Sequence, residues 1–266
     1  MATTIDIIGE DLLHNIVSRL PATSFAYAAC VSRSWNLVCE RVLSRPKLAS
    51  ACSFNPNFDD VVIEVLNKVL SQPIRPHFAI VSLGGSYEPD DDSDDEFEVL
   101  EEALDLITAA LGSNVQVVAN RPSGIIGRDE FSDEIKKIEL GFGEENDSIL
   151  LIVGFVPGLK VTTIPLAKPF EVFMHQGPET AMIDEFITNI REFSTSVSGC
   201  NSPAAIIMFA DIDACMIAVM EKMDYAMSPE TVIVGDALSR FRCNNEAQDG
   251  ISAAVALVFA VDRNKH

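Results

Sequence analysis

Between residues 9 and 45 the chain carries three short apolar patterns of helical period, separated by helix-breaking and capping residues. The first helix is predicted over residues 9–19, and five apolar side chains in or beside it share one sector of a helical projection: Leu12, Leu13, Ile16, Val17 and Leu20. Pro21 ends this helix because it has no backbone N–H to donate. Thr23 or Ser24 can cap a second helix and Ser32 a third. We therefore predict a small N-terminal module of three helices.

The small size of this module disfavours stable folding without further contacts. A helical unit of about 40 residues is near the lower limit for folding alone, and this stretch has no disulfide pair or metal-ligand cluster at useful spacing. Leu37 lies on the opposite side of the third helix from Trp35, so apolar side chains face two directions. We therefore expect a further core or a partner to cover part of its apolar surface.

After Pro46 the pattern changes to alternating helices and strands. Amphipathic helical patterns cover residues 59–70, 97–111, 179–194 and 213–223, and apolar runs of strand length cover 77–83, 114–119, 148–156, 159–164, 203–210, 230–235 and 251–261. Most of these strands are apolar throughout, which is typical of strands covered on both faces. We expect an α/β or α+β fold, in which a three-helix module precedes a layered α/β domain with a largely buried mixed sheet.

The expected domain organisation is a helical module at residues 1–52, a linker at 53–58 and the α/β domain at 59–266. An acidic loop is predicted at residues 87–98, eight of which are Asp or Glu. Within it, Ser93 precedes three acidic residues and is a candidate site for an acidophilic kinase. We find no tandem repeat of 20–50 residues, which disfavours a leucine-rich repeat or propeller array.

Charge and composition narrow the possible partners. The net charge is −21, and almost all of it lies after residue 52. Such a field repels nucleic acid and anionic membrane surfaces, so we expect neither as a partner. No apolar run reaches the roughly 18–20 residues of a membrane span, and no basic residue precedes Arg19, so a secretory signal is not expected. Six cysteines without a CxxC pair indicate a reducing compartment, the cytoplasm or the nucleus.

Catalytic motifs are missing from the sequence. It contains no GxSxG, HExxH or GxxxxGK[ST] pattern, and Gly141-Phe142-Gly143 lacks the third glycine of a dinucleotide motif. None of the four histidines stands in a recognisable motif, including His175 in its proline-rich surroundings. Asp211 and Asp213 follow a predicted strand, where they suit either a turn with a helix cap or a strand-end site. We expect a non-catalytic protein without a metal or cofactor.

The N-terminal module resembles an F-box, the adaptor-binding module of SCF-type ubiquitin ligases. The residues that carry the resemblance are Asp11-Leu12-Leu13, Ile16-Val17, Leu20-Pro21, Phe25 and Cys30-Val31-Ser32-Arg33-Ser34-Trp35. The family usually begins its first helix with Leu-Pro, and Ile8-Gly9 stands in that place here. The resemblance implies binding to a Skp-type adaptor, which connects to a cullin scaffold. The residues expected to dock the adaptor or to form the core that presents it are Leu12, Leu13, Ile16, Leu20, Pro21, Phe25, Val31 and Trp35.

The α/β region resembles the N-terminal half of a FIST domain, a module named for F-box and intracellular signal transduction proteins. The matching segments are Val117–Ala119 running into Ser123–Gly127, then Ile149–Gly158, Val232–Gly235 and Gly250–Val261. A C-terminal half usually follows in that family, so we expect either a fragment or a shortened version. FIST modules are thought to bind small ligands, which makes residues 120–128 a candidate ligand loop through Arg121, Ser123, Gly124, Gly127 and Arg128.

Physical chemistry supports two interpretations of that loop. Gly124 and Gly127 can adopt positive φ and allow close approach of the backbone, and Arg121 and Arg128 can hold a carboxylate or phosphate. Alternatively, the glycines only shape a turn and the arginines pair with nearby acids. For the whole chain, the sequence favours a substrate-recognition subunit of an SCF-type ubiquitin ligase. The alternatives are a small-ligand sensor with a degenerate F-box, and a small-molecule enzyme with its site at the strand ends near Asn120 or Asp211.

Overall fold

The computed structural model describes residues 9–55, 57–84, 94–129, 134–139, 148–167, 180–211, 214, 216–244 and 252–264. Within these residues the chain forms seven helices and eleven strands, which confirms the expected fold class. Several sequence predictions lie outside the described residues: Ser93 with most of the acidic segment 87–98, Gly141–Gly143, His175 and Asp213. Phosphorylation of Ser93 therefore stays a prediction.

The first 43 residues contain the three predicted helices: α1 (Glu10–Val17), α2 (Ala22–Ala29) and α3 (Arg33–Leu43). We call residues 10–44 the helical head. Six buried side chains form its core: Leu13, Val17, Phe25, Ala28, Val38 and Cys39. The Ser32 hydroxyl caps α3 by accepting a hydrogen bond from the Trp35 N–H at 3.3 Å, as predicted.

The predicted cap of α2 was wrong. Neither Thr23 nor Ser24 occupies that position, because the helix begins at Ala22, directly after Pro21 at the N-cap. The Ala22 N–H instead donates to the Leu70 carbonyl oxygen at 3.0 Å, at the end of the helix that spans Phe58–Val69 in the α/β region. A backbone donor that a capping side chain would satisfy is thus satisfied by the α/β region.

The first sheet has five strands in the order β1 (Lys47–Ser53), β6 (Ser148–Phe155), β2 (Phe78–Gly84), β3 (Gln116–Arg121) and β10 (Arg240–Cys243). Strands β2 and β3 are parallel and the other pairs are antiparallel. Helices α4 (Phe58–Val69) and α5 (Asp94–Leu111) cover one face, with Val65, Leu100 and Leu151 in the shared core. Gly112 follows α5 with φ +99°, a left-handed conformation in which a glycine commonly ends a helix.

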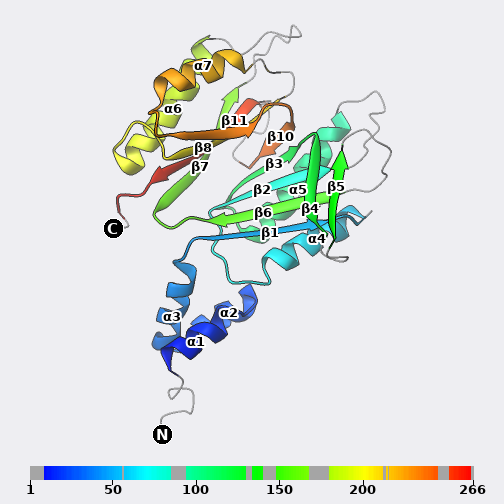
Figure 1. Ribbon diagram of the computed structural model, residues 1–266, viewed down its shortest axis with the longest axis vertical. Helices are drawn as coiled ribbons and strands as arrows, with labels where there is room; N and C mark the ends of the chain where they lie inside the picture. Colours follow the sequence, from blue (N-terminus) through cyan, green and yellow to red (C-terminus); the bar gives the residue numbers. More distant parts are fainter. Residues whose placement is uncertain are drawn as a thin grey trace.

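The second sheet has four strands in the order β7 (Leu159–Ala167), β11 (Ser252–Val261), β8 (Ala205–Ala210) and β9 (Val232–Asp236). Helices α6 (Thr180–Ser198) and α7 (Ile217–Ala226) cover its outer face, with Phe186 and Met223 in their core. Two further strands, β4 (Gly124–Arg128) and β5 (Ile135–Glu139), pair with each other. Figure 1 shows the helical head at one end of the molecule and α6 and α7 at the other.

The two sheets pack face to face, so that helices form the two outer layers. Along β11, Val255 and Leu257 pack with residues of the first sheet, whereas Ala256 and Val258 pack beneath the helices. Between the sheets the Phe78 and Phe259 rings meet edge to face at 5.2 Å. Side chains of a strand alternate between its faces, so a strand buried on both sides must be apolar at every position. The prediction that the strands are covered on both faces is confirmed. The sequence did not predict that one of these faces packs against a second sheet.

Both halves of the α/β region repeat one topology. Residues 47–155 run β1-α4-β2-α5-β3 and close with β6, and residues 159–261 run β7-α6-β8-α7-β9 and close with β11. The strand orders β1-β6-β2-β3 and β7-β11-β8-β9 correspond, with the same parallel and antiparallel pairs. This repeat has a period of about a hundred residues. A search for solenoid repeats of 20–50 residues therefore does not detect it.

Strand predictions failed where side chains are small, charged or few. β1 (KLASACS) lies within the predicted helical module and linker, β10 has four residues with two arginines, and β5 contains Lys136 and Lys137. None has the apolar run or clean alternation that marks a strand. The division into a head at residues 1–52 and a domain at 59–266 stays a prediction, although β1 pairs along its whole length with β6.

Candidate functional site

The helical head exposes a group of apolar side chains that the rest of the chain does not cover. These are Leu12 and Ile16 of α1, Tyr27 of α2, Val31 of the following turn and Leu37 of α3. We call these five residues the head patch. Tyr27 is 73% exposed and Leu12 57% exposed, in a module whose own core is closed. Several large apolar side chains exposed on one small module are typical of a protein-binding surface.

The eight residues predicted for docking or core divide by burial. Leu13 and Phe25 are core residues, and Leu20 and Trp35 are half-buried against the same core. The other four are exposed: Leu12, Ile16, Pro21 and Val31. Tyr27 was not predicted, although it lies two residues after the buried Phe25, a spacing that puts it on another side of the helix.

The head joins the α/β region through a narrow connection. Only residues 44–46 separate α3 from β1, and the Ala22 N–H to Leu70 hydrogen bond is a second link. Lys47, at the start of β1, donates from Nζ to the Pro73 carbonyl oxygen at 2.8 Å, and its partial burial lowers the pKa of this ammonium group. Glu10 and Arg41 form an exposed ion pair that joins α1 to α3. Of these interactions, the Ala22 to Leu70 hydrogen bond joins the head to the α/β region, and it leaves the residues of the head patch exposed.

The predicted ligand loop is not a loop. Arg121 ends β3 with 8% exposure, and Gly124, Gly127 and Arg128 belong to β4, a strand of a different sheet. Arg128 and Ser123 are exposed. The two arginines that were expected to act together thus differ in strand, sheet and burial, and their shared role in ligand binding stays a prediction.

The positive φ predicted for the two glycines was wrong, whereas the predicted close approach of the backbone is found at Gly127. In the described residues, positive φ occurs at Gly112, Gly158 and Gly199, and not in β4. Gly127 is required for close packing instead, because a Cβ there would lie 2.5 Å from the Cys52 Sγ atom. Sequence reasoning predicted a close approach but not its partner, since Cys52 comes from β1, 75 positions earlier in the chain.

Cys52 lies in a buried environment between β1 and β4. Burial and, to a smaller extent, the negative charge of Asp129 together raise the pKa of its thiol to about 12, while Lys136 acts in the opposite direction. Asp129 is itself buried and its Oδ2 accepts from Lys136 Nζ at 2.6 Å. This arrangement keeps the thiol protonated, so Cys52 is a packing residue and not a nucleophile.

Two arginines that the sequence did not single out lie on β10. Arg240 donates to Asp211 Oδ1 at 2.9 Å, and Arg242 Nε donates to Glu101 Oε1 at 3.0 Å. The Arg242 guanidinium also stacks 4.0 Å from the centre of the Phe97 ring. Arg242 thus attaches β10, which comes from the second half of the chain, to α5 of the first half, whereas Arg240 ties it to the end of β8.

The strand-end positions proposed for an enzyme are buried. Asn120 is 3% exposed and accepts a 2.8 Å hydrogen bond from the Ser82 hydroxyl. Asp211 is 3% exposed and pairs with Arg240, so it is not the predicted helix cap, because α7 begins later, at Ile217. Among the described residues, no group of three or more His, Cys, Asp or Glu is placed to hold a metal ion.

Comparison with known proteins identifies the head. Residues 5–47 match the family model of the F-box domain, which confirms the resemblance seen in the sequence. Over 275 residues the chain is 40% identical to a protein of Arabidopsis thaliana named F-box/LRR-repeat protein, and this similarity covers 97% of the chain and 49% of the relative. The chain therefore spans about half the length of the curated relative it matches.

The head is thus an F-box domain, and the chain that carries it has a relative among F-box proteins. The leucine-rich repeats in the relative's name are a feature of that protein. The described strands of this chain form two layered sheets and one separate strand pair. Within the described part of the chain, none of the helices combines the length and apolar character that crossing a membrane requires. The FIST resemblance of the α/β region stays a prediction.

Proposed function

We propose that this protein is the substrate-recognition subunit of an SCF-type ubiquitin ligase. In this proposal the F-box domain docks onto a Skp-type adaptor, which connects it to a cullin scaffold. The observation that carries the proposal is the head patch: an F-box domain with a closed core presents five apolar side chains that the α/β region leaves exposed. Exposed aromatic and aliphatic side chains such as Tyr27 suit the apolar core of a protein interface.

The protein performs no chemistry in this role. It brings a substrate close to the conjugating enzyme, so that the effective concentration of substrate lysines rises. The α/β region, which we propose to be FIST-like, recruits the substrate. Because this region carries nearly all of the negative charge, it favours targets with basic surfaces.

The free cysteine thiols support a proposal about the cellular compartment. Cys30 and Cys200 are exposed and free, and no disulfide is formed among the described cysteines. Exposed free thiols are typical of reducing environments. We propose that the protein acts in the cytoplasm, the nucleus or both.

Binding to a purified Skp-type adaptor tests the proposal. Ile16→Asp and Val31→Asp place a charge in the head patch without disturbing a buried residue, and each should weaken adaptor binding by at least tenfold, about 1.4 kcal/mol. Ile63→Asp, on exposed α4 surface of the other region, is the matched control and should bind as the wild type does. Absence of binding by the wild-type protein, or equal binding by all variants, would reject the ligase role.

A second candidate function, a small-ligand sensor, is favoured by the position of Arg121. This buried guanidinium lies in register with Arg240 of the neighbouring strand, which concentrates positive charge in an acidic region. Inorganic phosphate and succinate are suitable probes, because arginine pairs with both anion types. A rise in melting temperature that is lost in Arg121→Ala and kept in Arg128→Ala would support the sensor. No response of the wild type to either anion would reject it.

A further inference from the structure

Strand β9 forms one edge of the second sheet, and among the described residues no strand pairs with its outer side. The Val232 N–H donates to the Ala204 carbonyl oxygen at 3.2 Å, so Val232 and Val234 direct their backbone groups toward β8. Backbone groups alternate along a strand, which turns the N–H and C=O of Ile233 toward the outer edge. The strand thus offers hydrogen-bonding groups to a further strand.

The other edge strands carry features that discourage pairing. β7 contains Lys160 and Pro165, and β10 is four residues long with two arginines. β1 is partly covered by the β4–β5 pair, through a bridge between Cys52 and Asp129. Charges, prolines and covered ends are the usual protections of a sheet edge. β9 has the sequence VIVGD, without a proline or a basic residue.

The side chains of β9 are also unusually exposed. Val232 is 58% exposed and Val234 52% exposed, on the face that elsewhere packs against the first sheet. Leu238, just beyond the strand, is 62% exposed. At Gly235 the strand approaches β8 so closely that a Cβ would lie 2.1 Å from the Met208 carbonyl oxygen, which fixes β9 firmly against the sheet. An edge that is rigid and apolar is suited to binding.

The repeated topology indicates that the outer edge of β9 can pair with an extended segment. β3 of the first half corresponds to β9 of the second half, and β10 pairs antiparallel with the outer side of β3. No described strand occupies the corresponding position beside β9. The same receiving arrangement is therefore present twice, and the first copy shows that it binds an extended segment with apolar side chains, Phe241 and Cys243, turned into the core.

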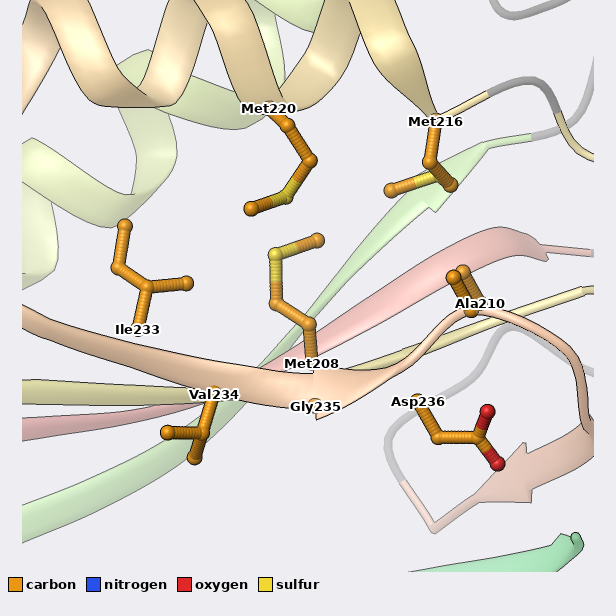
Figure 2. A pocket seen from close by; sticks show the side chains of 9 residues that line it. Met208, Ala210, Met216, Met220, Ile233, Val234, Gly235 and Asp236 are labelled. Carbon is orange, nitrogen blue, oxygen red and sulfur yellow. The ribbon is translucent and has the colours of Figure 1, made fainter.

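A cavity beside β9 provides a place for a side chain. It has a volume of about 190 Å³, and Figure 2 shows Met208 from the sheet facing Met216 and Met220 of α7, with Ile233 beside them. Methionine side chains are flexible and polarisable and adapt to different apolar groups. Residues 233–236 of β9 line this cavity, so a strand paired with the outer side of β9 would lie beside it.

Acidic residues near both ends of β9 favour basic residues at the ends of any segment that pairs with it. Glu230 lies two residues before β9, Asp236 is its last residue, and Asp224 is exposed on α7. The nearby Lys222 pairs with Asp184 and does not neutralise these groups. Basic residues on either side of an apolar segment would therefore be attracted, and acidic ones repelled.

We propose that the outer edge of β9 is a strand-addition site for a partner protein, which contributes an extended segment of about five residues flanked by Lys or Arg. Its backbone pairs with β9, one large apolar side chain enters the methionine-lined cavity, and its neighbours cover Val232 and Val234. This site stands independently of whether the F-box domain binds an adaptor.

The test uses an array of blocked hexapeptides and the full chain. The central positions sample apolar, polar and acidic residues, and the ends sample Lys, Ala and Asp; the lead probe is acetyl-Lys-Val-Leu-Val-Thr-Arg-amide. The wild-type protein should select apolar centres with basic ends. Val234→Lys should lower the affinity for the selected peptides at least about tenfold. Leu48→Lys, in β1 at an edge of the first sheet and 68% exposed, is the matched control and should leave binding unchanged.

Two further measurements decide the mode of binding. N-methylation of the amides on one side of the selected peptide should abolish binding, whereas methylation of the alternate amides should preserve it, because only one side faces β9. Equal effects of both patterns, or an array without selection, would overturn the proposal. Self-association of the wild type that Val234→Lys abolishes, seen by light scattering, would assign the edge to a second copy of this chain and would also overturn it.

Discussion

Gly127 in β4 and Cys52 in β1 are packed so closely that a Cβ at position 127 would lie 2.5 Å from the cysteine Sγ and 2.6 Å from its Cβ. The contact fixes the β4–β5 pair against the edge of the first sheet, where Cys52 and Asp129 also form a bridge. A glycine in an ordinary strand conformation is thus needed for its missing side chain and not for its φ angle.

The first prediction concerns this contact. Gly127→Ala should lower the free energy of unfolding by about 1–3 kcal/mol, because the added methyl group meets a buried neighbour that cannot move freely. Urea denaturation measures the change. Ser123→Ala, at an exposed position of the preceding turn, should stay within about 0.5 kcal/mol of the wild type. Equal stability of both variants would mean that β4 moves away from β1 easily.

The second prediction follows from the raised pKa of Cys52. At pH 8 a thiol reagent should modify the exposed Cys30 and Cys200 quickly, and Cys52 only after unfolding. Mass spectrometry of digested protein identifies the modified residues. Rapid labelling of Cys52 in the folded protein would contradict the burial described for it.

The same pKa predicts a loss of stability at high pH. In the unfolded chain Cys52 ionises around its ordinary value of 9.0, whereas in the folded protein its pKa is about 12. Its stabilising contribution is therefore complete below pH 9 and is lost as the pH rises from 9 to 12, with a slope of at most about 1.4 kcal/mol per pH unit. Cys52→Ala should show a shallower decline between pH 9 and 11 in urea titrations. Parallel declines in both proteins would contradict the assignment.

Two adjacent residues of the head give a third prediction. Leu13 is 5% exposed and Leu12 is 57% exposed, so Leu13→Ala should destabilise the head by about 2–5 kcal/mol and Leu12→Ala by less than about 0.5 kcal/mol. Hydrogen exchange of the α1 to α3 amides measures the local effect. If the F-box domain docks an adaptor through its head patch, Leu12→Asp should weaken that binding while the exchange pattern stays unchanged. Similar destabilisation by both alanine variants would show that Leu12 is not a surface residue.

The ion pairs of β10 give a fourth prediction. Asp211 is buried, so removing Arg240 leaves a carboxylate without this partner, and Arg240→Ala should cost about 1–3 kcal/mol. Glu101 is 60% exposed, so Glu101→Ala, which removes the partner of Arg242, should cost less than about 1 kcal/mol. Thermal unfolding of the two variants compares the pairs directly. If Glu101→Ala destabilised the protein more than Arg240→Ala, this order would be wrong, and the contact with α5 would contribute most to holding β10.

The sequence predicted regular elements best where hydrophobic period and length agree. The helix at residues 179–194 is α6, and the uninterrupted apolar run at 251–261 is β11, the strand at the centre of the second sheet. It failed at β1, β5 and β10, because short strands with small or charged side chains are defined by their neighbours. The F-box was recognised from local residues alone, since its core is formed within 35 positions.

What the sequence determined by itself is which residues must avoid water: the amphipathic faces of the helices and the strands that are apolar on both sides. Only the tertiary structure decided what covers each of them. Leu12 and Leu13 share one sector of the sequence pattern, yet one is exposed and the other buried. Likewise Val118 of β3 packs between the sheets, while Val234 on the corresponding strand β9 stays exposed. Burial depends on which distant segment of the chain packs against a residue. Strand β10 pairs with β3, whereas it does not pair with β9.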